Sequence, residues 1–167
     1  MSADTTADGG ATPRTVGLPG GGTVLARGLR AARIPDPPPQ FGLYLLGHPL
    51  DRPGLYGRRL VGLRPWTPPW PHERIDWPDF SAPRRPEEAM ARLREALARV
   101  ERGERVEVAC GGGRGRTGTA LAALAVLRGT PPAEAIAWVR TVYAAKAVET
   151  RSQRRFLDRV AASSIPA

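Results

Sequence analysis

The sequence predicts an α/β fold in which a central sheet is flanked by helices. Short apolar runs predict strands, and longer segments whose apolar residues recur every three or four positions predict helices. Alternation of the two patterns is typical of helices packed on a sheet. The chain has 167 residues, of which 41% are hydrophobic. That length and composition favour one domain with a substantial core.

The strands are predicted mostly in the first half of the chain. Residues 23–27 follow a triple-glycine turn, residues 41–46 and 60–63 are short apolar runs, and residues 105–109 lead directly into Cys110. The proline-rich segments between them are predicted as loops, because proline excludes both helix interiors and central strands. These loop segments are residues 34–39 and 65–78.

Four helices are predicted in the second half. The first begins at Pro86, and its apolar residues have the 3, 4, 3 spacing of a single helix face. The second covers residues 117–127 and is stopped by Gly129. The third begins at residues 130–131, and residues 150–153 have the form of a capping box that begins the last helix.

Domain organisation follows from these patterns. Residues 1–14 are predicted to be a flexible tail, because they are rich in Thr, Asp, Gly and Pro, and residues 15–167 a single domain. The longest apolar run, residues 120–127, is too short for a membrane span, which needs about 20 residues. The first eight residues have neither the basic start nor the apolar run of a secretory signal. We therefore expect a cytoplasmic protein without stable membrane association.

The charge of the chain points to anionic partners. The formal net charge is +9, and nearly all of the positive charge is arginine, because Lys146 is the only lysine. Such an excess attracts phosphorylated substrates, acidic lipids or nucleic acid. A nucleic-acid partner is not expected, because that hypothesis rests on charge alone, acidic residues near Glu87 weaken it, and no RNA-binding aromatic motif is present. The single cysteine can form neither an internal disulfide nor a cysteine-based zinc cluster.

The segment that carries most of the chemistry runs from Cys110 to Gly118, with the sequence CGGGRGRTG. Its glycines let the backbone curl so that several N–H groups point at one anion, and the following helix adds the positive end of its dipole. These groups favour the thiolate form of Cys110, which is the nucleophilic form. Arg116 supplies a planar fork for two phosphate oxygens, and Thr117 brings a hydroxyl within reach of the sulfur. The phosphate-binding residues predicted in this way are Gly111, Gly112, Gly113, Arg114, Gly115 and Arg116.

A purely structural role or a nucleotide-binding loop suits this segment less well. A lone cysteine is usually a small buried hydrophobe, and a glycine-rich turn is often only a turn. Arg116 at this spacing, followed by Thr117 and Gly118, favours the anion site instead. A P-loop would need lysine near its end, and a dinucleotide-binding loop would need an acidic residue on the next strand, and neither is present.

The same residues resemble the signature loop of the protein tyrosine phosphatase superfamily, which has Cys, five residues, Arg, and then Ser or Thr. Residues 77–79, Trp-Pro-Asp, are similar to the movable loop that carries the general acid in this family. Asp79 precedes Cys110 by 31 residues, with a helix and a strand predicted between them. This arrangement matches the compact dual-specificity members, so the resemblance implies a compact dual-specificity phosphatase fold.

The resemblance also implies a reaction. Phosphate monoesters would be hydrolysed in two steps through a thiophosphate intermediate, without metal or cofactor. Cys110 would attack phosphorus, Arg116 would hold the phosphoryl oxygens, Asp79 would protonate the leaving oxygen, and Thr117 would stabilise the departing thiolate. Gln153 is similar to a glutamine that positions the water of the second step, and the capping box explains the same residue equally well.

The substrate is less closely defined. The resemblance implies phosphotyrosine, with phosphoserine and phosphothreonine as further protein substrates. Arg114 keeps a phosphoinositide open, because lipid-directed members often carry basic residues in this loop. Ala109 stands where the family usually has histidine, and no segment matches the loop that forms a deep pocket in tyrosine-specific members. A non-catalytic phosphate-binding module is the other alternative, and Asp79 argues against it because a binder needs no acid. The sequence does not indicate an oligomeric state.

Overall fold

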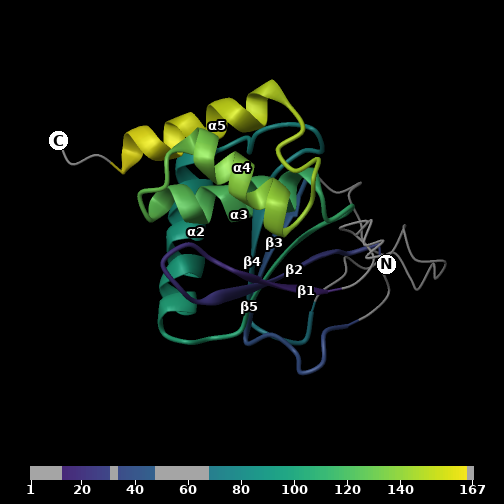
Figure 1. Cartoon of the computed structure of the whole chain (residues 1–167). Coiled ribbons are helices and arrows are strands. Elements are labelled where there is room, and N and C mark those ends of the chain that lie inside the picture. Colours follow the sequence, from purple (N-terminus) through teal and green to yellow (C-terminus); the bar gives the residue numbers. More distant parts are fainter. Residues whose placement is uncertain (1–12, 31–33, 48–67, 165–167) are drawn as a thin grey trace, which may run out of the picture.

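The structure is a computed structural model and describes residues 13–30, 34–47 and 68–164. It contains a five-stranded sheet in the order β1-β2-β5-β3-β4. Helices α2, α3, α4 and α5 lie together on one side of this sheet (Figure 1). The predicted central sheet with flanking helices is therefore confirmed.

The three central strands are parallel. They are β2 (Thr23–Gly28), β5 (Val106–Cys110) and β3 (Phe41–Leu46). In the register of the sheet, Cys110 lies opposite Gly28 on one side and Leu45 on the other. Because parallel strands end at the same edge, residues that follow them gather there, and Cys110 is the last residue of its strand.

The two edge strands differ in direction, and neither was predicted. β4 (His72–Asp76) pairs parallel with β3, and β1 (Arg14–Gly17) pairs antiparallel with β2. The prediction of a loop over residues 65–78 is therefore wrong for β4. That strand buries only Ile75 fully and has no apolar alternation, as suits an exposed edge strand. Arg14, assigned to the tail, is the first residue of β1 because it pairs with Ala26.

The helices occur where the sequence predicts them, with small shifts at their starts. α2 is Pro86–Glu101, α3 is Gly115–Leu127, α4 is Pro132–Val142 and α5 is Arg151–Ser163. α3 begins two residues before the predicted start, because the glycine-rich turn closes into the helix, and α4 begins just after its predicted start. The strands predicted at residues 23–27, 41–46 and 105–109 are confirmed within one residue at each end. The strand predicted at residues 60–63 lies outside the described residues.

The core explains why α3 is apolar along its whole length. Every residue of this helix from Gly115 to Val126 is buried, because α2, α4 and α5 pack around it and the sheet lies beneath. A second, smaller cluster lies on the opposite face of the sheet. It contains Leu29, Tyr44, Leu46 and Ala109.

A polar network accompanies this second cluster. The Arg27 guanidinium forms a buried ion pair with Glu107, and the Tyr44 hydroxyl donates to the Glu107 carboxylate at 2.6 Å. The indole N–H of Trp70 donates to the Tyr44 oxygen at 2.8 Å. Burial and the Glu107 charge both raise the pKa of Tyr44, so its hydroxyl stays a donor at neutral pH.

Candidate active site

The strand–loop–helix unit that holds Cys110 has a close-packed turn. Gly113 has φ of +70°, and a Cβ atom there would lie 2.6 Å from the Gly28 Cα on the neighbouring strand end. Only glycine fits both the left-handed backbone and this approach. The Gly113 N–H donates to the Cys110 Sγ at 3.1 Å. The turn therefore directs a backbone dipole at the sulfur, as its glycines predict.

Tyr143 holds the carbonyl group of Gly113, which belongs to the next peptide group along the chain. Its hydroxyl donates to the carbonyl oxygen of Gly113, and its side chain is only 2% exposed. Burial raises the pKa of Tyr143, and its electrostatic interaction with Cys110 raises it further. Arg14 lies over the Tyr143 ring at 5.9 Å and donates to its carbonyl oxygen at 2.6 Å. Arg14 of strand β1 therefore holds Tyr143 in place, and Tyr143 in turn holds the cysteine loop at Gly113.

Arg116 joins the cysteine loop to the segment predicted to carry the acid. Its side chain is fully buried, its Nη1 donates to the Trp77 carbonyl oxygen at 3.0 Å, and its Nε lies 3.4 Å from the Asp79 Oδ1. The Asp79 side chain is 40% exposed, so the carboxylate reaches solvent as well as the arginine. Residues far apart in the sequence thus meet as the motif pattern predicts.

The segment around Asp79 is anchored at one end and open at the other. Trp77 is fully buried, its ring packs edge-to-face against Phe156 at 5.2 Å, and its indole N–H donates to the Ser81 carbonyl oxygen. Phe80 has φ of +56° and is 63% exposed, which is unusual for a large apolar side chain. Its N–H donates to the Asp79 Oδ1 at 3.0 Å and so helps to orient the carboxylate.

The two polar atoms of the Gln153 side-chain amide have different surroundings. Its Oε1 accepts from the N–H groups of Glu149 and Thr150, which completes the capping box with Thr150. Its Nε2 is buried and has no hydrogen-bond partner among the described residues. A Cβ on Gly115 would lie 3.4 Å from this nitrogen, so the amide faces the start of α3. The capping prediction is confirmed, and it leaves a donor directed at the loop.

The remaining predicted residues differ in their surroundings. Thr117 is fully buried, and its hydroxyl forms no hydrogen bond in the described part of the chain, to the sulfur or to any other atom. Arg114 is exposed at the N-cap of α3. Gly112 is partly exposed, and the guanidinium of Arg30 lies beside it, 3.8 Å from the position a Cβ would take. Gly111 accepts from the Arg30 N–H at 3.1 Å.

Two residues at this site were not predicted. Tyr143 carries a helix-face signal in the sequence, which indicates burial and says nothing of its hydroxyl. Glu149 has its carboxylate against Gly115, where a Cβ would overlap it. Both belong to the connection between α4 and α5, and the pattern of that connection gives no indication that it contacts the cysteine loop.

The described residues form neither a metal cluster nor a helix that could span a membrane. Within residues 13–30, 34–47 and 68–164, no group of three His, Cys, Asp or Glu side chains is arranged to hold a metal ion. Over these same ranges, no helix combines the length and the apolar character needed to cross a bilayer.

Comparisons with solved structures agree with this geometry. The active form of Tk-PTP is 30% identical, with a TM-score of 0.54 over 72% of this chain and 78% of that one. Human DUSP28 is 16% identical, with a TM-score of 0.61 over 92% of this chain and 97% of that one. PTPN18, solved with HER2 phosphopeptides, is 17% identical, with a TM-score of 0.60 over 92% of this chain and 70% of that one. The last two similarities concern the fold alone.

A family comparison covers more than half of the chain. Residues 74–165 match the model described as "Swiss Army Knife protein, DSP-PTPase phosphatase domain". No curated protein matches the chain. The matched segment includes the cysteine loop, Asp79 and Gln153. The chain belongs to the dual-specificity-type phosphatase domains of the protein tyrosine phosphatase superfamily.

Proposed function

We propose that this chain hydrolyses phosphate monoesters with Cys110 as nucleophile. The observation that carries the proposal is the 3.4 Å approach of Arg116 Nε to Asp79 Oδ1. It brings an acid, an anion-binding fork and the cysteine loop together, although Asp79 and Cys110 are 31 residues apart in sequence. A site that only binds phosphate has no use for a carboxylate beside its arginine, because the negative charge repels the ligand.

In the first step, the Cys110 thiolate attacks phosphorus and forms a P–S bond while the P–O bond to the leaving group breaks. Asp79 donates its proton to the departing oxygen. Arg116 and the loop N–H groups, including that of Gly113, hold the equatorial oxygens where transition-state charge is spread. The carboxylate of Asp79 is partly exposed, so it can exchange protons with solvent between turnovers.

In the second step, a water molecule attacks phosphorus and the P–S bond breaks. Asp79, now a carboxylate, takes the proton of the water, and the sulfur leaves as a thiolate. The Nε2 of Gln153, which no described residue engages, is a suitable donor to orient this water. The hydroxyl of Thr117, likewise without a partner among the residues that the structure describes, is the group we assign to stabilise the departing sulfur.

Substrates of first choice are phosphotyrosine residues of proteins, followed by phosphoserine and phosphothreonine. The exposed Phe80 next to Asp79 supports an aromatic leaving group, because an aromatic ring can pack on it. Phosphoinositides are the alternative substrates. Their additional phosphates would need a second cation, and the exposed Arg114 could provide it.

A substrate panel tests the proposal. Phosphotyrosine, phosphoserine and phosphothreonine peptides, phosphoinositides and para-nitrophenyl phosphate are assayed with the wild type and with Cys110→Ser. We expect hydrolysis that disappears in the variant. Phosphate binding without turnover of any substrate by the wild type would identify a binding module instead.

A further inference from the structure

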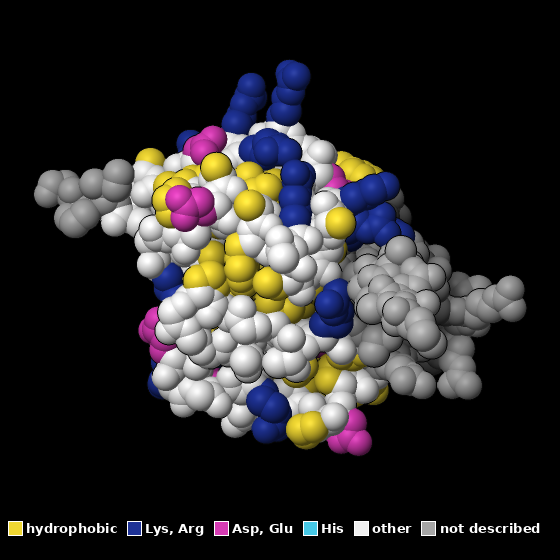
Figure 2. All heavy atoms as spheres, viewed as in Figure 1, with side chains coloured by type: hydrophobic (Ala, Val, Ile, Leu, Met, Phe, Trp, Pro, Cys, Tyr) yellow, Lys and Arg dark blue, Asp and Glu magenta, His cyan; other side chains and the backbone are white. Residues whose placement is uncertain are grey.

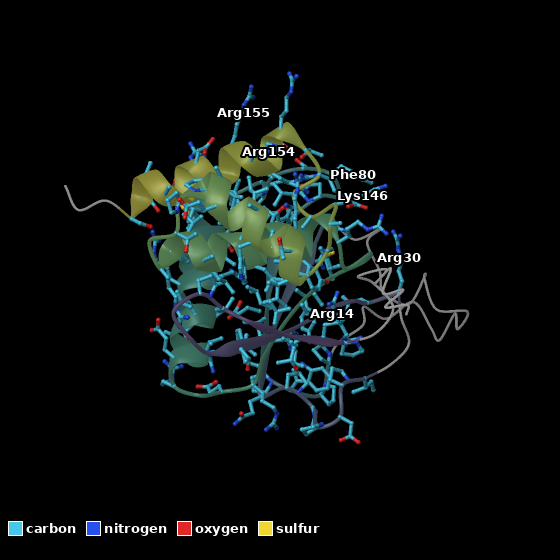
Figure 3. All side chains as sticks on the ribbon, in the orientation of Figure 1. Arg14, Arg30, Phe80, Lys146, Arg154 and Arg155 are labelled. Carbon is cyan, nitrogen blue, oxygen red and sulfur yellow. The ribbon has the colours of Figure 1, made fainter. Side chains whose placement is uncertain are left out.

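One face of α5 carries a row of exposed arginines. They are Arg151, Arg154, Arg155 and Arg159, and Asp158 is the only acidic residue of this helix. Their spacing of three and four residues places them on the same side of the helix. Dark blue side chains gather over α5 at the top of Figure 2, and Arg154 and Arg155 stand out from the helix in Figure 3. Among the residues that the structure describes, none offers these four side chains an ion pair or a hydrogen bond.

Two arginines of α2 show the opposite arrangement. Arg92 pairs with Glu73 at 2.5 Å and with Glu88 at 2.7 Å. Arg99 pairs with Glu95 and with Glu104, each at 3.0 Å. Two of the three arginines of α2 are therefore neutralised by neighbouring carboxylates, and the third, Arg94, donates to the Ser163 hydroxyl. The arginines of α5 remain available to an external anion.

A groove lies along this basic face. Its volume is about 380 Å³, and it is lined by Ala82, Pro86, Ser152, Arg155, Phe156 and Arg159. It lies close to the candidate active site, because Ser152 precedes Gln153 and Ala82 follows Asp79 by three residues. The apolar floor of the groove, formed by Ala82, Pro86 and Phe156, also contacts the candidate active site. Phe156 packs on Trp77, and the carbonyl oxygen of Trp77 accepts a hydrogen bond from Arg116.

We propose that this groove binds an acidic stretch of polypeptide next to the phosphorylated residue of a protein substrate. The inference rests on the proposed phosphatase function and narrows its substrate class. Arg155 and Arg159 are one helical turn apart, about 5–6 Å. In an extended peptide, alternate side chains point the same way and lie about 7 Å apart. Two acidic residues at alternate positions can thus reach both arginines while the peptide backbone crosses the apolar floor.

The groove suits a peptide better than other polyanions. Single-stranded nucleic acid binds by stacking its bases on exposed aromatic rings, and the one aromatic ring of the groove, Phe156, is 3% exposed and already packed on Trp77. A lipid surface presents its charges in a plane, whereas Arg155 and Arg159 line a hollow. An extended acidic peptide can fit into such a hollow, because its side chains reach in from a narrow backbone.

The test measures binding, so that it does not depend on turnover. Full-length protein with Cys110→Ser is titrated with fluorescent phosphotyrosine peptides that carry two alternate glutamates before the phosphotyrosine, two after it, or glutamines in their place. We expect one acidic peptide to bind about five- to tenfold more tightly than the glutamine peptide. Arg155→Glu with Arg159→Glu should abolish this ratio, and the milder pair Arg155→Gln with Arg159→Gln should reduce it.

A control carries the same change of charge elsewhere, at arginines that already have partners: Arg102 pairs with Glu104, and Arg105 donates to the Pro38 carbonyl oxygen. Its Tm is measured alongside, so that any loss of folding is seen. Arg102→Glu with Arg105→Glu alters exposed residues before β5, at the end of that strand opposite to Cys110, roughly 17 Å away. This control should keep the ratio. Equal affinity for acidic and glutamine peptides, or an equal loss of ratio in groove and control variants, would overturn the proposal. Arginine-dependent binding of phosphatidylserine vesicles or single-stranded RNA, with peptides bound indifferently, would also overturn it.

The two hypotheses fail in different ways. An acidic preference in the Cys110→Ser protein, together with a wild type that hydrolyses no phosphate ester, would support the groove and reject the phosphatase. Failure of every phosphopeptide to bind, acidic or neutral, would count against both.

Discussion

Tyr143 donates its hydroxyl proton to the carbonyl oxygen of Gly113, the residue whose own N–H is directed at the Cys110 sulfur. The Gly113 carbonyl shares its planar peptide group with the N–H of Arg114, so a donor that fixes this carbonyl also fixes the direction of that loop amide. Ala109 has no polar side chain to contribute to this loop. We interpret Tyr143 as a residue that positions the loop from the side of α4.

Tyr143→Phe tests this interpretation. It removes the hydroxyl and keeps the ring, and it leaves the buried carbonyl of Gly113 without its donor at a cost of about 1–3 kcal/mol. We expect slower alkylation of Cys110 by iodoacetamide at neutral pH, because the loop amides would be held less firmly against the sulfur. Because the chain has a single cysteine, alkylation reports on Cys110 alone. Tyr44→Phe is the matched control, since Tyr44 is also buried but donates to Glu107 on the other face of the sheet. An equal effect of both variants would contradict a specific role for Tyr143.

Asp79→Asn should separate catalysis from anion binding. The amide cannot donate a proton to the leaving oxygen, so kcat for para-nitrophenyl phosphate should fall by about 10²–10⁴. Vanadate should bind at least as tightly as to the wild type, because Arg116 loses a competing carboxylate at 3.4 Å. Asp76→Asn is the control, since Asp76 ends β4 and faces Arg84 at 3.8 Å. Unchanged kcat in Asp79→Asn would remove this residue from the mechanism.

Gly113→Ala should destabilise the chain strongly. The substitution forces a side chain into φ of +70° and against the Gly28 backbone, which cannot move aside as a flexible side chain would. We expect a loss of at least about 2 kcal/mol in urea unfolding. Gly112→Ala, which meets only the Arg30 guanidinium at 3.8 Å, should cost far less. Equal stability of the two variants would show that the turn is not held as described.

Thr150→Ala and Gln153→Ala should separate the two tasks of Gln153. Each variant removes one half of the capping box of α5, so each should lose about 1 kcal/mol of stability. Only Gln153→Ala also removes the Nε2 that faces Gly115. We therefore expect a larger burst of nitrophenol and slower steady-state turnover in that variant alone. If Thr150→Ala slows turnover as much, Gln153 acts only as a cap.

Alkaline stability should be governed by two buried tyrosines. Burial raises the pKa of both Tyr44 and Tyr143, so the folded chain holds these protons more tightly than the unfolded chain does. Their contribution is complete below the ordinary tyrosine pKa of about 10 and is lost as pH rises above it. Lys146 is the only lysine, so few other groups titrate there. Tm measured from pH 8 to 11.5 should fall less steeply in the Tyr44→Phe, Tyr143→Phe double variant. A fall as steep as that of the wild type would refute the assignment.

Much of this arrangement could be predicted from the sequence, because the relevant signals are local. The buried strand before Cys110, the glycine turn and the capping box at Thr150 each follow from residue types a few positions apart. β4 was missed for a physical reason. An edge strand such as His72–Asp76 needs no apolar alternation, and the prolines on either side of it indicated a loop.

The contacts that complete the site depend on packing between distant segments. The Tyr143 hydroxyl meets Gly113 across 30 residues, and Arg14 meets Tyr143 across 129. No short sequence pattern predicts such long-range contacts, because each of the two residues fits the ordinary pattern of its own segment. The resemblance to the family motifs predicted that Arg116 and Asp79 lie in one site. It gave no indication of the contact between Tyr143 and Gly113.

The measurement that most directly tests the central claim is mass analysis of protein quenched in acid during turnover of para-nitrophenyl phosphate. Gln153→Ala should accumulate the intermediate, because its breakdown is slowed. The account predicts one added phosphoryl group, located on the peptide that contains Cys110 and absent from the same variant carrying Cys110→Ser. Rapid turnover with no phosphoryl group on that peptide, or with the group on another residue, would contradict it.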